Sequence, residues 1–447
     1  MHAGLVLSGL VALVAATPTV EKQLPNRAAS LPAVTASGNA FWVGNERFYI
    51  RGIDYQPGGS SSDDDPLAHP DICLRDIAKF KKLGVNTIRV YMVDNTLDHD
   101  ECMTALAEAG IYLVLDANTP KYSINRKDPF PSYNGAYLQN VFATIDVFQK
   151  YDNTLAFFSG NEVINEEPGT TISAPYVKAV TRDMRRYIKE RKYRGIPVGY
   201  SAADVSENRM QTAHYFNCGP DDTRSDFFAF NDYSWCSSNY TVAGWDRKVA
   251  NFTGYGLPIF LSEYGCNTNK RDFGEVEALM SSEMTGVYSG GLMYEYTMET
   301  NKYGIVKISS SGEVTELDEF ANFRSALAKY PAPSGTAGAT ATTSAVDCPA
   351  QDAAWEVDPD ILPAMPTTAE KYFSEGAGTG QGFAGLGSQT DWDSGVSAQN
   401  ITGTSKSGPG AGSGTSEDAA GRLNLGAGAI FVTGGALAFS LFGTLLL

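Results

Sequence analysis

The chain has 447 residues, 43% of them apolar, which is enough for a large buried core. Its formal net charge is −17 at pH 7. This excess of acidic side chains argues against nucleic acid or another anionic surface as a partner, because phosphate binding requires clustered Lys and Arg. The charge balance fits a secreted, soluble protein that acts on a neutral substrate.

The first residues have the order of a secretory signal peptide. The stretch MHAGLVLSGLVALVAATPTV is a short apolar run that ends in Ala15 and Ala16, and small residues at that point are typical of a cleavage site. No Lys or Arg precedes the apolar run. We predict a signal peptide over residues 1–16; the alternative is a buried N-terminal strand.

Apolar, β-rich segments then alternate with helix-like stretches as far as Tyr330. This alternation predicts parallel strands joined by helical crossovers. Eight such units over about 290 residues fit an α/β fold of the (β/α)8 TIM barrel type, which we place at residues 35–350. The alternative is an open doubly wound sheet, but no GxGxxG motif follows the first segment to support a nucleotide site. The predicted strands are residues 48–54, 87–91, 111–116, 155–162, 196–201, 227–231, 258–263 and 291–296.

Polar residues recur where the predicted strands end. The carboxyl ends of the strands build the active site of such a barrel, so we expect these side chains to surround one mouth. Two of them are glutamates, Glu162 after the fourth strand and Glu263 at the end of the seventh, and we expect them to face each other. The other strand-end residues are Asp54, Tyr55, Gln56, Arg89, Tyr91, Asp116, Asn161, Tyr264, Glu295 and Tyr296.

A facing pair of carboxylates is what glycoside cleavage with retention requires, when the two groups stand about 5–5.5 Å apart. We predict that Glu162 is the general acid/base, with a raised pKa, and that Glu263 is the nucleophile, which must stay ionised. Arg89 would hold Glu263 charged; the alternative for Arg89 is an ordinary salt bridge of the barrel. Asn161 would bond the sugar 2-hydroxyl. Aromatic residues expected at the mouth, as sugar platforms or as packing residues, are Tyr55, Tyr91, Tyr233, Trp235, Tyr294, Tyr296 and Tyr303.

The chain contains six cysteines, and an even count in a secreted protein indicates disulfides. Their spacing does not choose the pairing. It also offers no CxxC or Cys/His pattern for a metal, and we expect neither a metal nor a cofactor. Candidate N-glycosylation sites are the sequons at Asn239, Asn251 and Asn400.

The composition changes near Pro331. Beyond this point the chain is rich in Gly, Ser, Thr and Ala, which bury too little surface to offset the entropy of ordering the chain. We predict a low-complexity flexible spacer over residues 351–414. A more apolar island at residues 355–373 interrupts it, and we expect this island to pack on the main domain because we also expect Cys348 to pair there.

The last residues have the order of a GPI-attachment signal. Small residues at positions 413–415 precede a polar stretch and then an apolar tail with no charged residue after it. We predict attachment at Gly414, with Gly412 and Ser413 as alternatives, and a propeptide over residues 415–447. The structural alternative is a single membrane-spanning helix, which usually carries basic residues on its cytoplasmic side.

The chain also shares seven stretches with a known family: RGIDYQPGG, NTIRVYMVDNT, YLVLDANTP, FFSGNEV, FNDYSWC, IFLSEYGC and GGLMYEYTMETNKYG. Together, and in this order, they resemble the fungal GPI-anchored β-1,3-glucanosyltransferases of the Gas/Gel type, glycoside hydrolase family 72. The resemblance implies that Glu162 in GNE is the acid/base and that Glu263 in SEYGC is the nucleophile. The disulfides that it implies are Cys73–Cys102, Cys218–Cys348 and Cys236–Cys266.

The resemblance further implies a two-step transfer. The enzyme would cleave within a β-1,3-glucan, keep one piece as a glycosyl-enzyme, and pass it to the non-reducing end of a second β-1,3-glucan, which elongates cell-wall glucan. Its partners would be donor and acceptor glucan chains and, through the GPI anchor, the outer leaflet of the plasma membrane beside the cell wall. The implied sugar contacts are Tyr91, Asn161, Tyr294, Ser123 and Arg126 on the donor side, Asp204 and Arg209 on the acceptor side, and Gln56, Asp116, Tyr233 and Tyr303 along the groove.

One branch of that family carries a cysteine-rich module after the barrel. Only Cys348 follows Tyr330, where the alternation of predicted strands and helices ends, so we expect that module to be absent. Two other functions compete with transfer. A retaining endo-β-1,3-glucanase would use the same glutamates to hydrolyse glucan, and a non-catalytic wall protein would bind glucan without needing a carboxylate pair.

Overall fold

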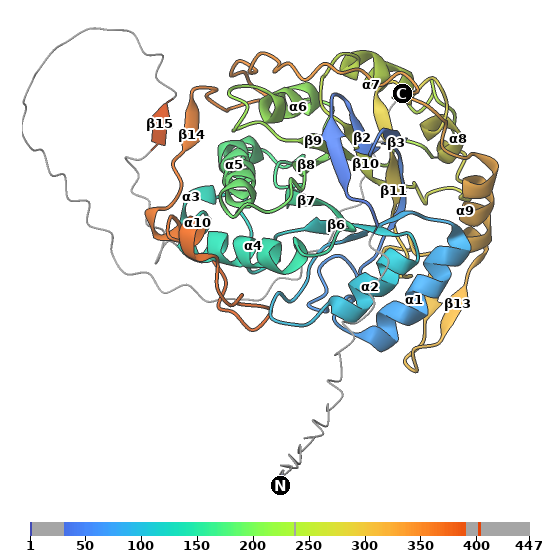
Figure 1. Cartoon of the computed structure of the whole chain (residues 1–447). Coiled ribbons are helices and arrows are strands. Elements are labelled where there is room, and N and C mark those ends of the chain that lie inside the picture. The colour runs from blue at the N-terminus through green and yellow to red at the C-terminus, as the bar shows by residue number, and fades with distance from the viewer. Residues whose placement is uncertain (2–30, 237, 390–400, 404–447) are drawn as a thin grey trace, which may run out of the picture. The chain divides into compact units, whose positions relative to one another are not determined.

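The computed structural model describes residues 31–236, 238–389 and 401–403, together with Met1, and a closed barrel of parallel strands forms its centre (Figure 1). The strands follow one another around the barrel in chain order, and β11 pairs with β4 to close it. The predicted (β/α)8 barrel is therefore confirmed, and the open doubly wound sheet is wrong. The barrel strands are β4 (Ile50–Asp54), β5 (Thr87–Val90), β6 (Tyr112–Asp116), β7 (Thr154–Asn161), β8 (Val198–Ala203), β9 (Phe227–Asp232), β10 (Ile259–Tyr264) and β11 (Tyr288–Met293).

The barrel strands are buried along nearly their whole length, as β6 and β9 illustrate. One face of each strand points into the barrel and the other lies beneath helices, so these strands read as continuous apolar runs rather than alternating ones. Close strand pairing also needs glycine at particular positions. A Cβ on Gly199 would lie 2.4 Å from the carbonyl oxygen of Phe227 on the neighbouring strand.

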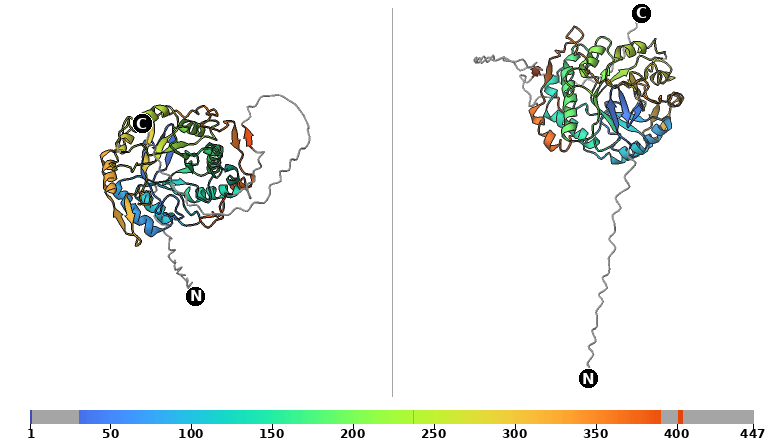
Figure 2. Two further views of the ribbon diagram at one scale, coloured as in Figure 1. Left: turned by 180° about the vertical axis from the view of Figure 1, so that it is seen from behind. Right: turned by 45° about the horizontal axis from the view of Figure 1, so that its top comes forward.

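Helices follow the barrel strands and surround them (Figures 1 and 2). Local sequence sets their ends: α1 begins with Pro70 and ends before Gly84, which adopts a left-handed φ of 82°. Asn134 caps α4 by accepting a hydrogen bond from the backbone N–H of Tyr137. The elements outside the barrel sheet are α1 (Pro70–Leu83), α2 (Asp100–Glu108), α3 (Pro129–Ser132), α4 (Gly135–Phe148), η1 (Thr170–Ser173), α5 (Ala174–Glu190), α6 (Arg209–Asn217), α7 (Trp245–Phe252), α8 (Glu275–Leu279), the hairpin β12 (Val306–Ile308) and β13 (Val314–Glu316), and α9 (Asp318–Lys329).

A small antiparallel sheet closes the amino end of the barrel. It consists of β1 (Val34–Ser37), β2 (Ala40–Val43) and β3 (Glu46–Phe48). Phe41 of β2 is fully buried, with its ring centroid 5.9 Å from that of Phe227 and 5.8 Å from that of Phe260. The interior of the barrel at this end is therefore a packed aromatic core.

The eighth barrel strand, β11, lies earlier in the chain than the predicted strand at residues 291–296. Glycine usually weakens a strand pattern, but Gly290 and Gly291 lie inside β11. A Cβ on Gly290 would lie 2.0 Å from the carbonyl oxygen of Ile50, so glycine permits the close pairing with β4. Tyr294 therefore belongs to the loop after the strand, where its N–H donates to the Tyr264 carbonyl at 2.9 Å.

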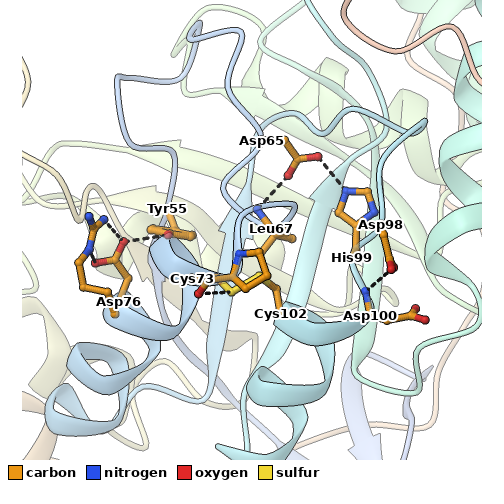
Figure 3. The surroundings of a disulfide bond; sticks show 11 residues. Tyr55, Asp65, Leu67, Cys73, Asp76, Asp98, His99, Asp100 and Cys102 are labelled. Carbon is orange, nitrogen blue, oxygen red and sulfur yellow. Dashed lines mark hydrogen bonds and ion pairs between the residues drawn. A yellow bond between two sulfur atoms is a disulfide. The ribbon is translucent and has the colours of Figure 1, made fainter. Parts of the chain in front are cut away.

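The described residues contain three disulfides, Cys73–Cys102, Cys218–Cys348 and Cys236–Cys266, which match the pairings that the resemblance implies. Figure 3 shows the first of them, which joins α1 to α2. On one side of it the Tyr55 hydroxyl donates to Asp76 at 2.9 Å, and on the other a ring nitrogen of His99 lies 2.8 Å from Asp65. These contacts anchor the loops that follow β4 and β5.

The described residues between Ala350 and Gln389 pack on the helices. Trp355 is fully buried against Tyr215, with ring centroids 5.5 Å apart, and Phe373 lies against Phe142 at 5.9 Å. The island at 355–373 thus packs on the main domain as expected, and contacts continue to Gln389, within the stretch predicted as a flexible spacer. The elements here are β14 (Ile361–Pro363), η2 (Thr367–Ala369), α10 (Tyr372–Glu375) and β15 (Ile401–Gly403).

Several predicted features lie outside the described residues: almost all of the signal peptide, the sequon at Asn400, the attachment residue Gly414 and the propeptide. In the part of the chain that the structure describes, no helix combines the length and apolarity needed to cross a bilayer. Asn239 and Asn251 are both exposed, as glycan attachment requires.

Candidate active site

Glu162 stands one residue beyond β7, at the carboxyl end of the barrel. Its φ of 47° lies in the left-handed region that non-glycine residues rarely occupy. Its N–H donates to the Ser201 carbonyl at 2.9 Å, and its own carbonyl accepts from the Arg126 guanidinium at 3.0 Å. The carboxylate accepts from Asn231 Nδ2 at 2.8 Å. The strained backbone is therefore held from both sides, which fixes the direction of the carboxylate.

Glu263 lies within β10, and three donors converge on its carboxylate. The hydroxyl of Tyr91 donates to Oε1 at 2.8 Å, and that of Tyr233 donates to Oε2 at 2.5 Å. The Arg89 guanidinium reaches Oε1 at 3.2 Å. Hydrogen bonds to a carboxylate stabilise its charged form, so this set favours an ionised Glu263.

Arg89 is fully buried and serves more than one partner. Besides Glu263, it binds Asp116 through two nitrogens, with Nε 2.8 Å from Oδ2 and Nη2 3.2 Å from Oδ1. Its guanidinium also lies 4.2 Å from the ring centroid of Tyr91. Both alternatives considered for Arg89, a contact to the nucleophile and a barrel salt bridge, are therefore present together.

A chain of neutral polar groups links the strands between the two glutamates. Asn161 Oδ1 accepts from Ser201 Oγ at 2.7 Å and from Asn231 Nδ2 at 3.1 Å. Ser262 Oγ donates to Asn231 Oδ1 at 2.8 Å. Both bonds to Asn161 use its carbonyl oxygen, so its amide nitrogen is the end that can donate to a substrate hydroxyl.

The sequence prediction had placed Asn231 at the end of a strand but assigned it no role. It lies opposite Glu263 in the pairing of β9 with β10 and bonds the carboxylate of Glu162. The strand-end argument that selected the glutamates applies equally to Asn231, and could have identified it.

Burial raises the pKa of both glutamates, that of Glu263 to about 7. The charge of Glu162 also raises the pKa of Glu263, so the site favours one charge over two. Arg89 and the two tyrosine hydroxyls oppose burial at Glu263, whereas Glu162 has one amide donor. Three groups donate to the carboxylate of Glu263 and one group donates to that of Glu162. We therefore assign the single charge to Glu263, whose donors stabilise it more strongly.

Two further buried carboxyls lie near this pair. Neither carboxylate oxygen of Asp54 has a hydrogen-bond partner, and burial raises the pKa of Asp54 well above its usual value, with Glu263 and Glu295 adding to the effect. Burial likewise raises the pKa of Glu295 to about 8, although Asn301 donates to it at 2.7 Å. Burial therefore favours the protonated form of both groups, although the charge of Arg89 opposes this effect at Asp54.

Four tyrosines gather beside Glu263. The ring centroid of Tyr294 lies 6.4 Å from that of Tyr91, 6.1 Å from that of Tyr233 and 5.4 Å from that of Tyr303. The other aromatic residues expected at the mouth lie elsewhere. Tyr55 and Tyr296 are fully buried against Phe80 of α1 with their hydroxyls on Asp76, and Trp235 packs on Trp245. Tyr55 and Tyr296 therefore pack against α1, and Trp235 packs against α7.

The predicted acceptor residues belong to a network of charges. Asp204 forms an ion pair with Arg209 and accepts from Lys248 Nζ at 2.6 Å. Lys248 also reaches Asp232 at the end of β9, at 2.5 Å. Despite burial, these two cations lower the pKa of Asp204, so it remains ionised. Lys248 lies on α7, far from the strand ends in sequence, and no sequence signal pointed to it.

The remaining predicted residues contact loops rather than the glutamates. Gln56 donates to the Asp64 carbonyl at 2.6 Å and accepts from the N–H of Tyr91 at 3.2 Å, so it joins the loop after β4 to the end of β5. Ser123 accepts from Gln389 of the C-terminal segment.

Within the described ranges, no group of three or more His, Cys, Asp or Glu side chains is arranged to hold a metal.

The chain is similar in sequence and structure to several known proteins. A family model described as Glucanosyltransferase matches residues 23–331. The chain is 65% identical over 354 residues to 1,3-beta-glucanosyltransferase gel1 of Aspergillus fumigatus, which covers 79% of this chain and 78% of that protein. It is 52% identical over 371 residues to 1,3-beta-glucanosyltransferase GAS5 of Saccharomyces cerevisiae, with 81% and 76% covered. A solved structure of a Saccharomyces cerevisiae Gas2p mutant in complex with laminaritetraose and laminaripentaose matches with a TM-score of 0.70 and 40% identity, over 75% of each chain.

Proposed function

The chain belongs to the glucanosyltransferase family, glycoside hydrolase family 72, and from that premise we propose that Glu263 is its nucleophile and Glu162 its general acid/base. The protein is a 1,3-β-glucanosyltransferase, as its curated relatives are named. The observation that carries the assignment is the difference in donors: Arg89 and two tyrosine hydroxyls at Glu263 against one amide at Glu162. The carboxylate with more hydrogen-bond donors is held more strongly in its charged form and is the one suited to attack.

In the first step, the Glu263 carboxylate attacks the anomeric carbon of an internal sugar of the donor chain. The glycosidic C–O bond breaks, and Glu162 gives its proton to the departing oxygen. The reducing-end piece leaves, and the other piece stays bonded to Glu263. Transfer of negative charge away from Glu263 then leaves Arg89 paired with Asp116, which keeps the cation satisfied.

In the second step, Glu162 acts as the base. Its carboxylate takes the proton from a hydroxyl at the non-reducing end of the acceptor, and the resulting oxygen attacks the anomeric carbon from the face that the leaving group vacated. The bond to Glu263 breaks, so two inversions give retention and a longer β-1,3 chain. Transfer exceeds hydrolysis when the acceptor sugar excludes water and positions its hydroxyl.

Two sides of the mouth hold the two sugars in this proposal. Asn161 presents its amide nitrogen toward the 2-hydroxyl of the sugar that reacts, because its oxygen is already bonded. Asp204 and Arg209 face the acceptor, held by Lys248. The further proposed contacts are Tyr91, Tyr294, Ser123 and Arg126 toward the donor, with Gln56, Asp116, Tyr233 and Tyr303 along the groove.

We also propose where the enzyme works. The predicted signal peptide and GPI signal would carry it to the outer leaflet of the plasma membrane, facing the cell wall. The exposed sequons at Asn239 and Asn251 and the three disulfides fit the secretory route. Measuring release of the native protein from cells by a phosphatidylinositol-specific phospholipase tests the anchor; retention with the membrane after complete digestion counts against it.

The test of function uses the secreted protein and one reduced laminari-oligosaccharide of a single length, with products sized by mass spectrometry. Chains longer than the input are the expected result. Only shorter chains would identify a hydrolase, and an unchanged input a binding protein without catalysis.

A second arm tests the acceptor side with Asp204→Asn. This variant should shift the products from transfer toward hydrolysis, because the acceptor competes less well with water. Asp221→Asn is the matched control, since the Asp221 side chain is 93% exposed, and it should keep the wild-type ratio. An unchanged ratio in Asp204→Asn would remove the acceptor assignment.

A further inference from the structure

The glycine-rich segment at residues 377–389, which we call the strap, is built into the barrel domain. Its sequence, AGTGQGFAGLGSQ, has the composition of a flexible linker. In Figure 1 the orange chain that follows α10 passes beside α4. At its start, Gln139 of α4 donates to the carbonyls of Ala377 and Thr379, each at 2.8 Å.

The middle of the strap binds the loop after β5. The N–H of Gly382 donates to Asn95 Oδ1 at 3.1 Å, and the N–H of Phe383 donates to Asp94 Oδ2 at 3.1 Å. Asn95 is itself buried, and its amide nitrogen donates to the Asn140 carbonyl at 3.0 Å. Side chains of the barrel loop thus satisfy the backbone of the strap, as a strand partner would.

The end of the strap binds the loop after β6. Lys121 Nζ donates to the Phe383 carbonyl at 2.5 Å, and the N–H of Ser388 donates to the Lys121 carbonyl at 2.9 Å. Gln389 Nε2 donates to the carbonyl of Ser123 at 2.9 Å. Ser388 is fully buried, so this end of the strap is covered by the domain that it contacts.

Glycine is required in the strap for close packing. A Cβ on Gly380 would lie 1.9 Å from Asn95 Oδ1, and a Cβ on Gly385 would lie 2.1 Å from the hydroxyl of Tyr122. Tyr122 is buried and adjacent to Ser123, so it has little room to yield. The composition that resembles a spacer therefore reflects close contact between backbone and barrel loops.

We propose that the strap is a positioning element for the donor side of the active site. It fixes the loop after β6, which carries Ser123 and Arg126, and Arg126 in turn binds the carbonyl of Glu162. Because Glu162 has a left-handed φ, its carboxylate direction depends on these backbone contacts. The proposal rests on the proposed function, in which this loop contacts the donor glucan.

The test substitutes Gly385→Val in the full-length chain and measures kcat and KM for a laminari-oligosaccharide donor. The added side chain would displace Tyr122 and the loop, so we expect KM for the donor to rise roughly two- to tenfold, the range set by losing one or two hydrogen bonds. Dependence on acceptor concentration should be unchanged. Leu386→Ala is the matched control, because Leu386 lies in the same strap with its side chain 91% exposed, and it should behave as wild type.

A second variant, Gln389→Ala, tests the strap if Gly385→Val fails to fold, because it removes the contact to Ser123 without adding volume. We expect a smaller rise in donor KM with an unchanged Tm. An unaltered donor KM in both variants, while the wild type still lengthens its substrate, would overturn the strap proposal and leave the proposed function standing. Loss of kcat and Tm together, with donor KM constant, would likewise overturn it, because the strap would then act on stability alone. A wild type that makes no longer chains would instead refute the function itself.

Discussion

The two ends of the barrel are built from the same strands, but they bury opposite kinds of side chain. At the amino end, Phe41, Phe227 and Phe260 pack ring against ring beneath the small sheet β1–β3. At the carboxyl end, Arg89 is surrounded by buried acids, among them Glu263 and Asp54. Apolar burial stabilises the fold, whereas burial of like charges opposes it.

The difference indicates a division of labour along the barrel axis. The amino end contributes stability that offsets the cost of holding several carboxyls near one another at the carboxyl end. A substitution in the aromatic core of the amino end should lower stability and leave the rate unchanged. A substitution of a buried acid at the carboxyl end should lower the rate without this loss of stability. The predictions below test this contrast, from the largest expected effect to the smallest.

Glu263→Gln should remove both cleavage and transfer, with the rate falling by about 10⁴-fold or more, as loss of a nucleophile does in other enzymes. Binding of laminari-oligosaccharides, measured by calorimetry, should persist. Glu275→Gln is the matched control: burial raises the pKa of Glu275 to about 7 as well, but this residue lies on α8. Wild-type-like turnover in Glu263→Gln would contradict the nucleophile assignment.

Glu162→Gln should slow the reaction by roughly 10²- to 10⁴-fold, the usual share of general acid–base catalysis. The loss should shrink with an aryl glycoside donor whose leaving group needs no proton, because bond cleavage then no longer depends on the acid. Glu313→Gln provides the control, since Glu313 is an exposed carboxylate far along the chain from Glu162, and it should keep the wild-type rate. Equal losses on the two donors would argue that Glu162 is not the acid.

Phe41→Ala should lower the free energy of unfolding by about 3–5 kcal/mol, the range for truncating a buried phenylalanine. Activity per folded molecule should stay near the wild-type value, because Phe41 lies at the end away from the glutamates. Chemical denaturation with parallel activity measurements checks both, and Val242→Ala, at a side chain that is 75% exposed, should change neither. A fall in the rate per folded molecule of Phe41→Ala would contradict the separation of stability and catalysis between the two ends.

The pH dependence of stability should carry the sign of the buried acids. The folded-state pKa of Glu263, about 7, lies above its usual value of 4.5, so the folded form binds the proton more tightly. Stability from this group falls as pH rises between these values. The Tm of Glu263→Gln should therefore exceed that of wild type near pH 8, and the gap should close toward pH 4.5.

Glu316 supplies a control of the opposite sign. Hydrogen bonds from Lys79 and Lys82 lower its pKa, so Glu316→Gln should cost stability at neutral pH, and that cost should vanish as the pH falls through the lowered pKa of the folded state. Parallel pH profiles for the two variants would contradict the electrostatic account of the mouth.

Strand-end reasoning predicted much of this site because it depends only on order along the chain. In a parallel barrel, the residue that ends a buried strand must lie at the mouth, which is enough to place Glu162, Glu263, Arg89 and Asp116. The same rule placed Tyr296 wrongly. The glycines of β11 weaken its strand pattern, so the predicted strand began and ended too late in the sequence.

Other parts could not be predicted because composition does not reveal partners. Lys248 reaches Asp204 only through the packing of α7, and a helix carries no sequence mark of the ion pair that it will make. The strap has the glycine content of a linker, yet each close approach, such as that of Gly380 to Asn95, depends on a surface formed by distant residues. Tertiary contacts decide these features.

The surplus of acids around one guanidinium has a consequence for inhibition. A six-membered ring with a protonated nitrogen places a fixed positive charge where the sugar develops its own during bond cleavage. Such an iminosugar would stabilise the anionic form of Glu263 and lower the pKa of Asp54 and Glu295 beside it. Its binding would therefore expel protons into the buffer, and its affinity would strengthen as the solution becomes less acidic until the inhibitor itself loses its charge.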